Sequence, residues 1–168
     1  MDDADPNVKV CLVCTGNICR SPMAEAVVGH AAKKHGLHWE VSSRGTGAWH
    51  QGSNADPRAL AVLRQNGLGL TGHKAQRFSD TDFNYFDVIL AMDQENYLEI
   101  TSRVKAKEHL SKVHLYLEFA GSKEPSKEVP DPYFGDKTDF EEVFNLLCSS
   151  ADAVVAHIME SLEPRDRG

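Results

Sequence analysis

The sequence lacks an apolar run near the roughly 18 residues that a helix needs to cross a bilayer, so no membrane insertion is expected. It also lacks a basic excess, because 18 Lys and Arg stand against 25 Asp and Glu, a formal net charge of −7. This balance argues against nucleic acid and against an anionic membrane surface as general partners. Residues 1–6 are acidic and have no apolar core, which predicts neither a secretory signal nor an Arg-rich transit peptide.

Cysteine is scarce. The chain has four in 168 residues, three of them between positions 11 and 19, which does not resemble a disulfide scaffold. This usage suits a reducing compartment, so a cytoplasmic location is expected. There is no repeat, low-complexity tract or interdomain linker, and 41% hydrophobic content suffices for one core. We expect a single domain over 1–168, with flexible ends at 1–6 and 164–168.

Short apolar strands alternate with helical patterns along the chain. Strands are predicted at 8–13, 39–43, 86–91 and 113–117, and helices at 21–34, 54–67, 94–107 and from 138 to near 162. Gly67 suits a helix end, Asp93 suits a helix cap, and Thr138 with Glu141 has the capping-box spacing. The order predicts an α/β fold, a doubly wound open sheet of about four parallel strands with helices on both faces.

The connection after the first strand carries the strongest chemical signal. Cys14 is followed by five residues and then Arg20, directly before a helix that starts near Ser21 and Pro22. Such a loop can turn consecutive backbone N–H groups toward one anion, while the guanidinium adds two parallel hydrogen bonds. The helix N-terminus adds positive potential at the same place. In doubly wound sheets, ligands bind at the carboxyl ends of the strands, where this first strand-to-helix loop emerges. Cys14 is therefore predicted to be an activated nucleophile beneath a bound phosphoryl group.

A second signal is Asp131, which lies between Pro130 and Pro132. Two prolines hold the carboxyl on a stiff, non-helical turn, from which it could reach over a pocket. Phosphoester cleavage needs such an acid, because the leaving oxygen must receive a proton. The turn alone is a weak signal, and it gains weight only from the Cys14 loop.

Other motifs have simpler interpretations. Cys11 and Cys14 form a Cys-x-x-Cys pattern, but Cys11 lies inside a predicted strand and is expected to be a small buried residue. No second cysteine pair or His pair completes a zinc site. Residues 67–72 match Gly-x-Gly-x-x-Gly as text, yet they follow a helix rather than a strand, which favours a turn.

Together these residues resemble the low-molecular-weight protein tyrosine phosphatases. The resemblance covers nearly the whole chain and rests on 10–25, Trp49, 56–59, 72–75, 91–93 and 131–133. It implies that Cys14 is the nucleophile, that Arg20 binds phosphate, and that Asp131 is the general acid and then the base. It implies no metal and no cofactor.

The resemblance also assigns the remaining site residues. Substrate-binding positions are Thr15, Gly16, Asn17, Ile18, Cys19, Ser21, Trp49, Tyr133 and Phe134, with Ser43 and His73 behind them. The implied substrates are phosphotyrosine proteins or small aryl phosphates, with acid phosphatase activity and with inorganic phosphate as product and inhibitor. Many relatives carry two adjacent tyrosines where this chain has Tyr133 and Phe134, so phosphorylation of both positions is not expected.

Three other functions remain open as alternatives. A thioredoxin-coupled arsenate reductase would need two further cysteines, and residues 71–91 contain none. A protein-arginine phosphatase would carry a small polar residue where this chain has apolar Ile18. A noncatalytic phosphopeptide-binding module would have lost the nucleophile or the acid, whereas this chain retains Cys14, Arg20 and Asp131.

The loop also predicts redox control. Cys14 and Cys19 are five residues apart on a tightly curled segment, which would bring their sulfurs close enough to join. Cys19 is expected to resolve an oxidised Cys14 and protect it from irreversible oxidation. The alternative is that Cys19 is only a small residue suited to packing inside the loop.

Overall fold

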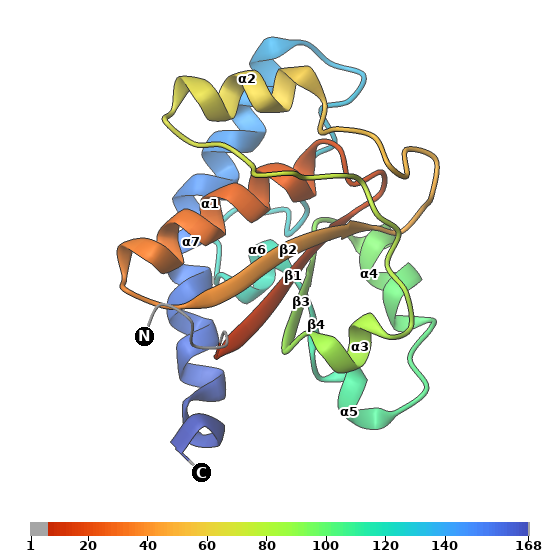
Figure 1. Cartoon of the computed structure of the whole chain (residues 1–168), viewed down its shortest axis with the longest axis vertical. Helices are drawn as coiled ribbons and strands as arrows, with labels where there is room; N and C mark the ends of the chain where they lie inside the picture. The colour runs from red at the N-terminus through yellow and green to blue at the C-terminus, as the bar shows by residue number, and fades with distance from the viewer. Residues whose placement is uncertain (1–6, 168) are drawn as a thin grey trace.

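A computed structural model describes residues 7–167, and the side chains of residues 7–162 (Figure 1). The predicted flexible segment 1–6 lies outside the described residues, as does Gly168. The prediction of flexible ends stays a prediction, and the backbone of residues 164–167 belongs to the C-terminal helix. In chain order the elements are β1 (Val8–Cys14), α1 (Arg20–Lys34), β2 (Trp39–Gly45), α2 (Pro57–Gln65), α3 (Asp82–Tyr85), β3 (Val88–Ala91), α4 (Gln94–Thr101), α5 (Lys107–Leu110), β4 (Val113–Leu115), α6 (Tyr116–Phe119) and α7 (Lys137–Arg167).

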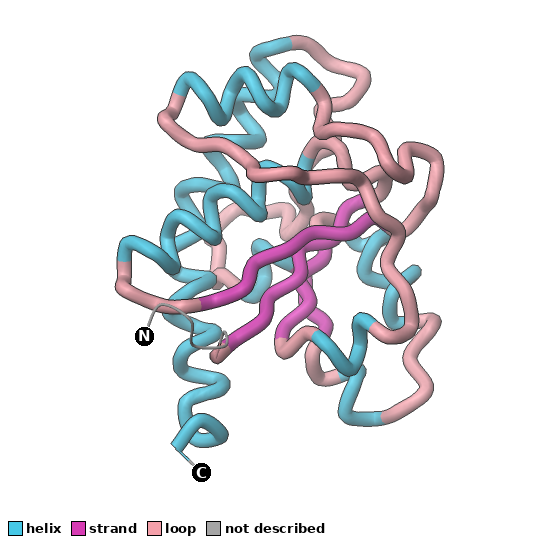
Figure 2. Tube along the Cα trace, viewed as in Figure 1, coloured by secondary structure: helices cyan, strands magenta, loops and turns pink. Residues whose placement is uncertain are grey.

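The sheet is parallel and has the order β2-β1-β3-β4, as the doubly wound prediction requires. Figure 2 shows the strands side by side between helices. Helices α1, α2 and α7 pack on one face with Val10 and Leu12 of β1. The other face carries Cys11 and Val13, which pack against α3 and α4. Every second residue of β1 therefore enters a different core, which explains its continuous apolar sequence.

The two cysteines of the Cys-x-x-Cys pattern lie on opposite faces of the sheet. Cys11 is fully buried, and burial raises the pKa of its thiol. Its predicted role as a small buried residue is confirmed.

Several predicted boundaries differ from the observed ones. The expected helix 54–67 begins at Pro57, after the Asp56 cap, and ends at Gln65. The expected helix 94–107 ends at Thr101, because only Asn96 and Ile100 are buried along it, and α5 is a separate turn. The expected strand 113–117 ends at Leu115, and residues 116–119 form α6. The expected strand from 86 begins at Val88, after the short helix α3, which was not predicted.

The predicted capping box of α7 was displaced by two residues. Asp136, not Thr138, accepts from the amides of Thr138 and Asp139, at 2.9 and 3.3 Å. The side chain of Asp139 accepts in return from the amide of Asp136 at 2.8 Å. This is the same reciprocal arrangement with aspartates as both partners.

Residues 137–162 of α7 are long and apolar enough to cross a membrane by length and composition alone. In this fold the apolar stripe of Phe140, Leu147, Val154 and Ile158 is instead buried in the core with α1. Helix α7 is therefore a core helix that packs, with α1, on one face of the sheet (Figure 1).

Candidate active site

The loop of residues 14–20, called the phosphate loop below, connects the end of β1 to the start of α1. Four carbonyls of this loop accept hydrogen bonds from residues outside it. The Cys14 carbonyl accepts from the amide of Thr46 at 2.9 Å, and the Thr15 carbonyl accepts from the amide of Gly47 at 3.0 Å. The Asn17 carbonyl accepts from the His73 ring at 3.0 Å, and the Ile18 carbonyl accepts from the amide of Asp56 at 2.8 Å. In a planar trans peptide the N–H points opposite to the C=O. The amides that follow these carbonyls therefore face the inside of the loop, where they can surround an anion.

Asn17 fixes the curl of the phosphate loop. It is the one non-glycine residue with a positive φ, 59°, among residues 7–162. Its side-chain amide donates to the hydroxyls of Ser21 at 2.8 Å and Ser43 at 2.9 Å, and its side-chain oxygen accepts from the amide of Gln76 at 2.9 Å. Three hydrogen bonds, two of them buried, thus hold a backbone conformation that few residues adopt.

The Cys14 sulfur lies at the base of the phosphate loop and is almost fully buried. It is 3.0 Å from the Ser21 hydroxyl oxygen and 3.3 Å from the Asn17 amide nitrogen. Both groups can donate to a thiolate, which stabilises negative charge on the sulfur before attack and again when it is released.

A chain of polar side chains continues behind Asn17. Ser43 donates to Glu25 at 2.7 Å, and a ring nitrogen of His73 lies 3.8 Å from the same carboxyl oxygen. Burial raises the pKa of Glu25, although Ser43 and His73 act in the opposite direction. Ser43 and His73 therefore occupy the predicted places behind the loop, and Glu25 joins them.

Arg20 is buried and firmly held. One terminal nitrogen donates to Asp93 at 2.7 Å and to the Val129 carbonyl at 2.9 Å. The other is 3.4 Å from the Thr15 hydroxyl and 3.9 Å from an Asp131 oxygen. Burial disfavours its charge, but Cys14 and Asp93 outweigh this and raise the pKa of Arg20 above its ordinary value. Asp93 also caps α4, as predicted, by accepting from the amide of Asn96 at 2.7 Å.

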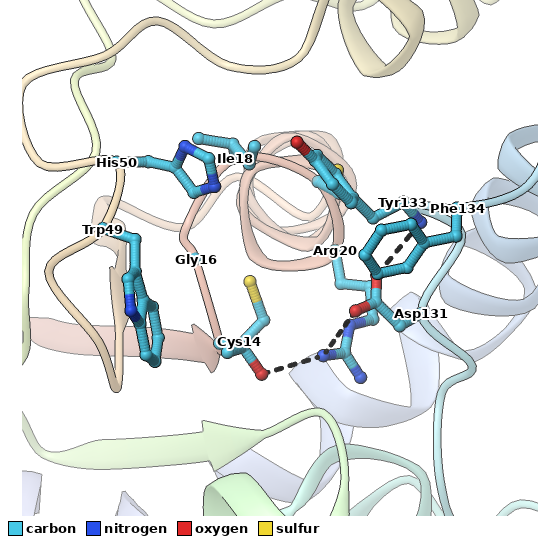
Figure 3. Close-up of a pocket in the computed structure, with 11 residues that line it drawn as sticks. Cys14, Gly16, Ile18, Arg20, Trp49, His50, Asp131, Tyr133 and Phe134 are labelled. Atoms are coloured by element: carbon cyan, nitrogen blue, oxygen red, sulfur yellow. Dashed lines mark hydrogen bonds and ion pairs between the residues drawn. The ribbon is translucent and has the colours of Figure 1, made fainter.

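The loop of residues 129–136, called the acid loop below, brings Asp131 to the mouth of the site. The Asp131 side chain is 47% exposed, whereas the Arg20 side chain is 3% exposed. Its other polar contact is with the nearby Tyr133 amide at 3.1 Å (Figure 3). A partly exposed carboxyl facing the cavity is free to exchange protons with a bound ester or with water.

The phosphate loop, the acid loop and the turn at Trp49 and His50 enclose a cavity of about 280 Å³. Its lining is Cys14, Thr15, Gly16, Ile18, Cys19, Arg20, Trp49, His50, Asp131, Tyr133 and Phe134. Trp49 and Phe134 are 75% and 94% exposed and stand as aromatic walls at the opening (Figure 3). An anion can sit deep in the loop while a flat apolar ring lies between these walls.

The structure thus brings the predicted side chains together. Asn17 and Ser21 support the loop from below instead of lining the cavity. Sequence reasoning missed the cavity residue His50, whose ring lies so close that a Cβ at Gly16 would be 2.9 Å from its Cδ2. It also assigned no role to Arg58, which reaches the acid loop. The sequence signal for His50 was its position next to Trp49, and that for Arg58 was its place in the matched segment 56–59.

Comparisons with known proteins agree on one family. A family model described as low molecular weight phosphotyrosine protein phosphatase matches residues 9–163. The chain is 47% identical to the low molecular weight phosphotyrosine protein phosphatase of Schizosaccharomyces pombe, over 82% of this chain and 88% of that protein.

Two solved structures are similar throughout. A protein tyrosine phosphatase from Entamoeba histolytica superposes with a TM-score of 0.86 at 32% identity, over 92% of this chain and 99% of that one. A Drosophila arginine phosphatase superposes with a TM-score of 0.82 at 34% identity, over 90% of this chain and 98% of that one.

Proposed function

The chain belongs to the low molecular weight phosphotyrosine protein phosphatase family, and from this premise we propose that it hydrolyses phosphotyrosine and aryl phosphate monoesters through a cysteinyl-phosphate. The observation that carries the proposal is the position of the Cys14 sulfur, beneath inward-facing loop amides and between two donors. Arg20 and Asp131 face the same cavity. Phosphotyrosine proteins or small aryl phosphates are the proposed substrates.

In the first step the Cys14 sulfur attacks phosphorus in line, and the bond from phosphorus to the aryl oxygen breaks. Asp131 gives its carboxyl proton to the departing oxygen, so no free phenolate forms. The loop amides and the Arg20 guanidinium bind the three equatorial oxygens as their charge redistributes. Because these donors are already fixed by hydrogen bonds outside the loop, little reorganisation is needed in the transition state.

In the second step water attacks the cysteinyl-phosphate. Asp131, now a carboxylate, takes a proton from the water, and the bond from phosphorus to sulfur breaks. The Ser21 hydroxyl and the Asn17 amide lie within 3.0 and 3.3 Å of the sulfur and stabilise the thiolate that leaves. The product, inorganic phosphate, fits the same loop and is expected to inhibit.

The catalytic roles can be tested by three substitutions. Cys14→Ser and Arg20→Lys should each abolish turnover without unfolding the protein, because the intermediate needs sulfur and the two-point contact needs a planar guanidinium. Asp131→Asn should lose far more rate with phenyl phosphate, a poor leaving group, than with p-nitrophenyl phosphate. Steady-state and burst kinetics would measure both steps. Near-normal turnover by Cys14→Ser would overturn the mechanism.

We also propose that the two cysteines of the phosphate loop form a protective redox pair in a cytoplasmic enzyme. Cys14 and Cys19 line the same cavity as free thiols. Burial, followed by the negative charge of Asp56, raises the pKa of Cys19, which keeps it a thiol while Cys14 reacts. Peroxide would oxidise Cys14 to a sulfenic acid, and Cys19 would displace water from it to give a disulfide.

The test compares wild type with Cys19→Ser after the same peroxide exposure. Wild type should recover activity with a thiol reductant, whereas Cys19→Ser should recover much less, because its Cys14 advances to irreversible oxidation. Mass spectrometry should find a Cys14 to Cys19 linkage only in oxidised wild type. Equal recovery of the two proteins would leave Cys19 with a packing role alone.

A further inference from the structure

An ion pair at the start of α2 connects the two loops of the site. Asp56 accepts from the Arg58 amide at 2.8 Å and from its side-chain nitrogens at 3.1 and 2.9 Å. Burial alone would raise the pKa of Asp56, but these hydrogen bonds outweigh it and the pKa lies below its ordinary value. Asp56 is therefore ionised at neutral pH and fixes the direction of the guanidinium.

The pair is attached to the phosphate loop on one side. The Asp56 amide donates to the Ile18 carbonyl at 2.8 Å. The Cys19 thiol, in the same loop, also helps to lower the pKa of Asp56. Asp56 is thus fixed relative to the loop that surrounds the nucleophile.

On the other side Arg58 holds the acid loop. Its two terminal nitrogens donate to the carbonyls of Gly135 and Tyr133, each at 3.0 Å. The guanidinium carbon also lies 4.4 Å from the ring centre of Phe140 and 5.8 Å from that of Tyr133. These contacts use the planar, forked shape of arginine, which lysine does not share.

Asp131 lies between two points at which hydrogen bonds hold the acid loop. Val129 forms the first: its amide donates to Met92 at 2.8 Å and its carbonyl accepts from Arg20. The second is the pair of carbonyls held by Arg58. The Asp131 side chain is about half exposed, and its carboxylate comes no closer than 3.9 Å to Arg20. Its own contacts therefore hold it weakly. Its placement over the cavity depends on the two points to either side.

We propose that Arg58, oriented by Asp56, is a positioning residue that holds Asp131 where it can protonate the leaving group. The proposal rests on the proposed function, because it takes Asp131 as the general acid. Arg58 does not touch the reacting atoms, so its loss should act through proton transfer. A displaced acid harms poor leaving groups most, since these depend most on protonation.

The experiment measures kcat/KM, which reports the substrate-dependent first step, for Arg58→Met with phenyl phosphate and p-nitrophenyl phosphate. We expect the loss with phenyl phosphate to exceed that with p-nitrophenyl phosphate by about tenfold. Arg64→Met, at an exposed arginine on the same helix, is the matched control and should leave both rates unchanged. If Arg58→Met does not fold by circular dichroism, Arg58→Lys retains the cation and undergoes the same comparison.

A double-mutant cycle separates positioning from general support of the fold. With Asp131→Asn the acid is already absent, so adding Arg58→Met should cost no more than about twofold in kcat/KM. Equal losses across the leaving groups, or additive losses in the double variant, would overturn the positioning role while the wild type remains an active phosphatase. A wild type that hydrolyses neither ester would instead overturn the proposed function.

Discussion

Ile18 is the branched apolar residue of the phosphate loop that lines the cavity. It is 8% exposed. An isoleucine can pack on a phenyl ring but offers no hydrogen bond to the N–H groups of a guanidinium. This contrast bears on substrate class, because a Drosophila arginine phosphatase shares the fold at 34% identity.

We predict that Ile18→Thr lowers kcat/KM for a phosphotyrosine peptide and raises it for a phosphoarginine peptide. One apolar contact contributes about 1–3 kcal/mol to discrimination, so the change in the ratio should be partial. Parallel assays of both peptides, with p-nitrophenyl phosphate as reference, would measure it. An unchanged ratio would show that position 18 does not distinguish the substrates.

The residues of the site differ in how far the sequence could reveal them. Cys14 and Arg20 were predictable because the geometry of their loop depends on a local spacing. Arg58 was not, because its partners Tyr133 and Gly135 lie 75 and 77 residues away. Its hydrogen bonds to the acid loop go to backbone carbonyls, which leave no mark in side-chain patterns. His50 was missed for a related reason, since it meets Gly16 only after the chain folds.

At the scale of elements, existence was easier to predict than boundaries. All four strands were found, yet the expected strand at 113–117 was too long, because apolar Tyr116 and Leu117 are buried in a helical turn. Burial explains why both are apolar but does not specify backbone conformation. The cap of α7 shows the same limit: Thr138 and Glu141 have the expected spacing, but Asp136 and Asp139 form the hydrogen bonds.

At the scale of the whole molecule, the parallel sheet determines where the loops meet. The phosphate loop follows β1, and Asp93 follows β3, the strand directly beside it. Both therefore emerge at the carboxyl edge of the sheet, which the alternating pattern predicted. The acid loop arrives there from a long connection after α6, and its attachment through Arg58 could be known only from the folded chain.

That attachment also predicts how stability of the whole protein changes with pH. The pKa of Asp56 is lowered in the folded protein, whereas an unfolded Asp has a pKa near about 3.9. The stabilisation by ionised Asp56 is therefore complete above about pH 4 and is lost as pH falls through the folded pKa. Glu25, whose pKa burial raises, acts in the opposite sense, but it is common to all variants compared.

We predict that Asp56→Asn is less stable than wild type near neutral pH and that the difference shrinks in acid. Thermal unfolding at about pH 6 and about pH 3 would measure it, because protonation removes the interaction from wild type alone. Asp152→Asn is the control: Lys34 also lowers the pKa of Asp152, but the Lys34 and Asp152 side chains are 53% and 62% exposed. Such an exposed pair contributes little. A pH-independent deficit in Asp56→Asn, or a larger convergence in Asp152→Asn, would show that the ion pair joining the two loops is not the acid-sensitive contact.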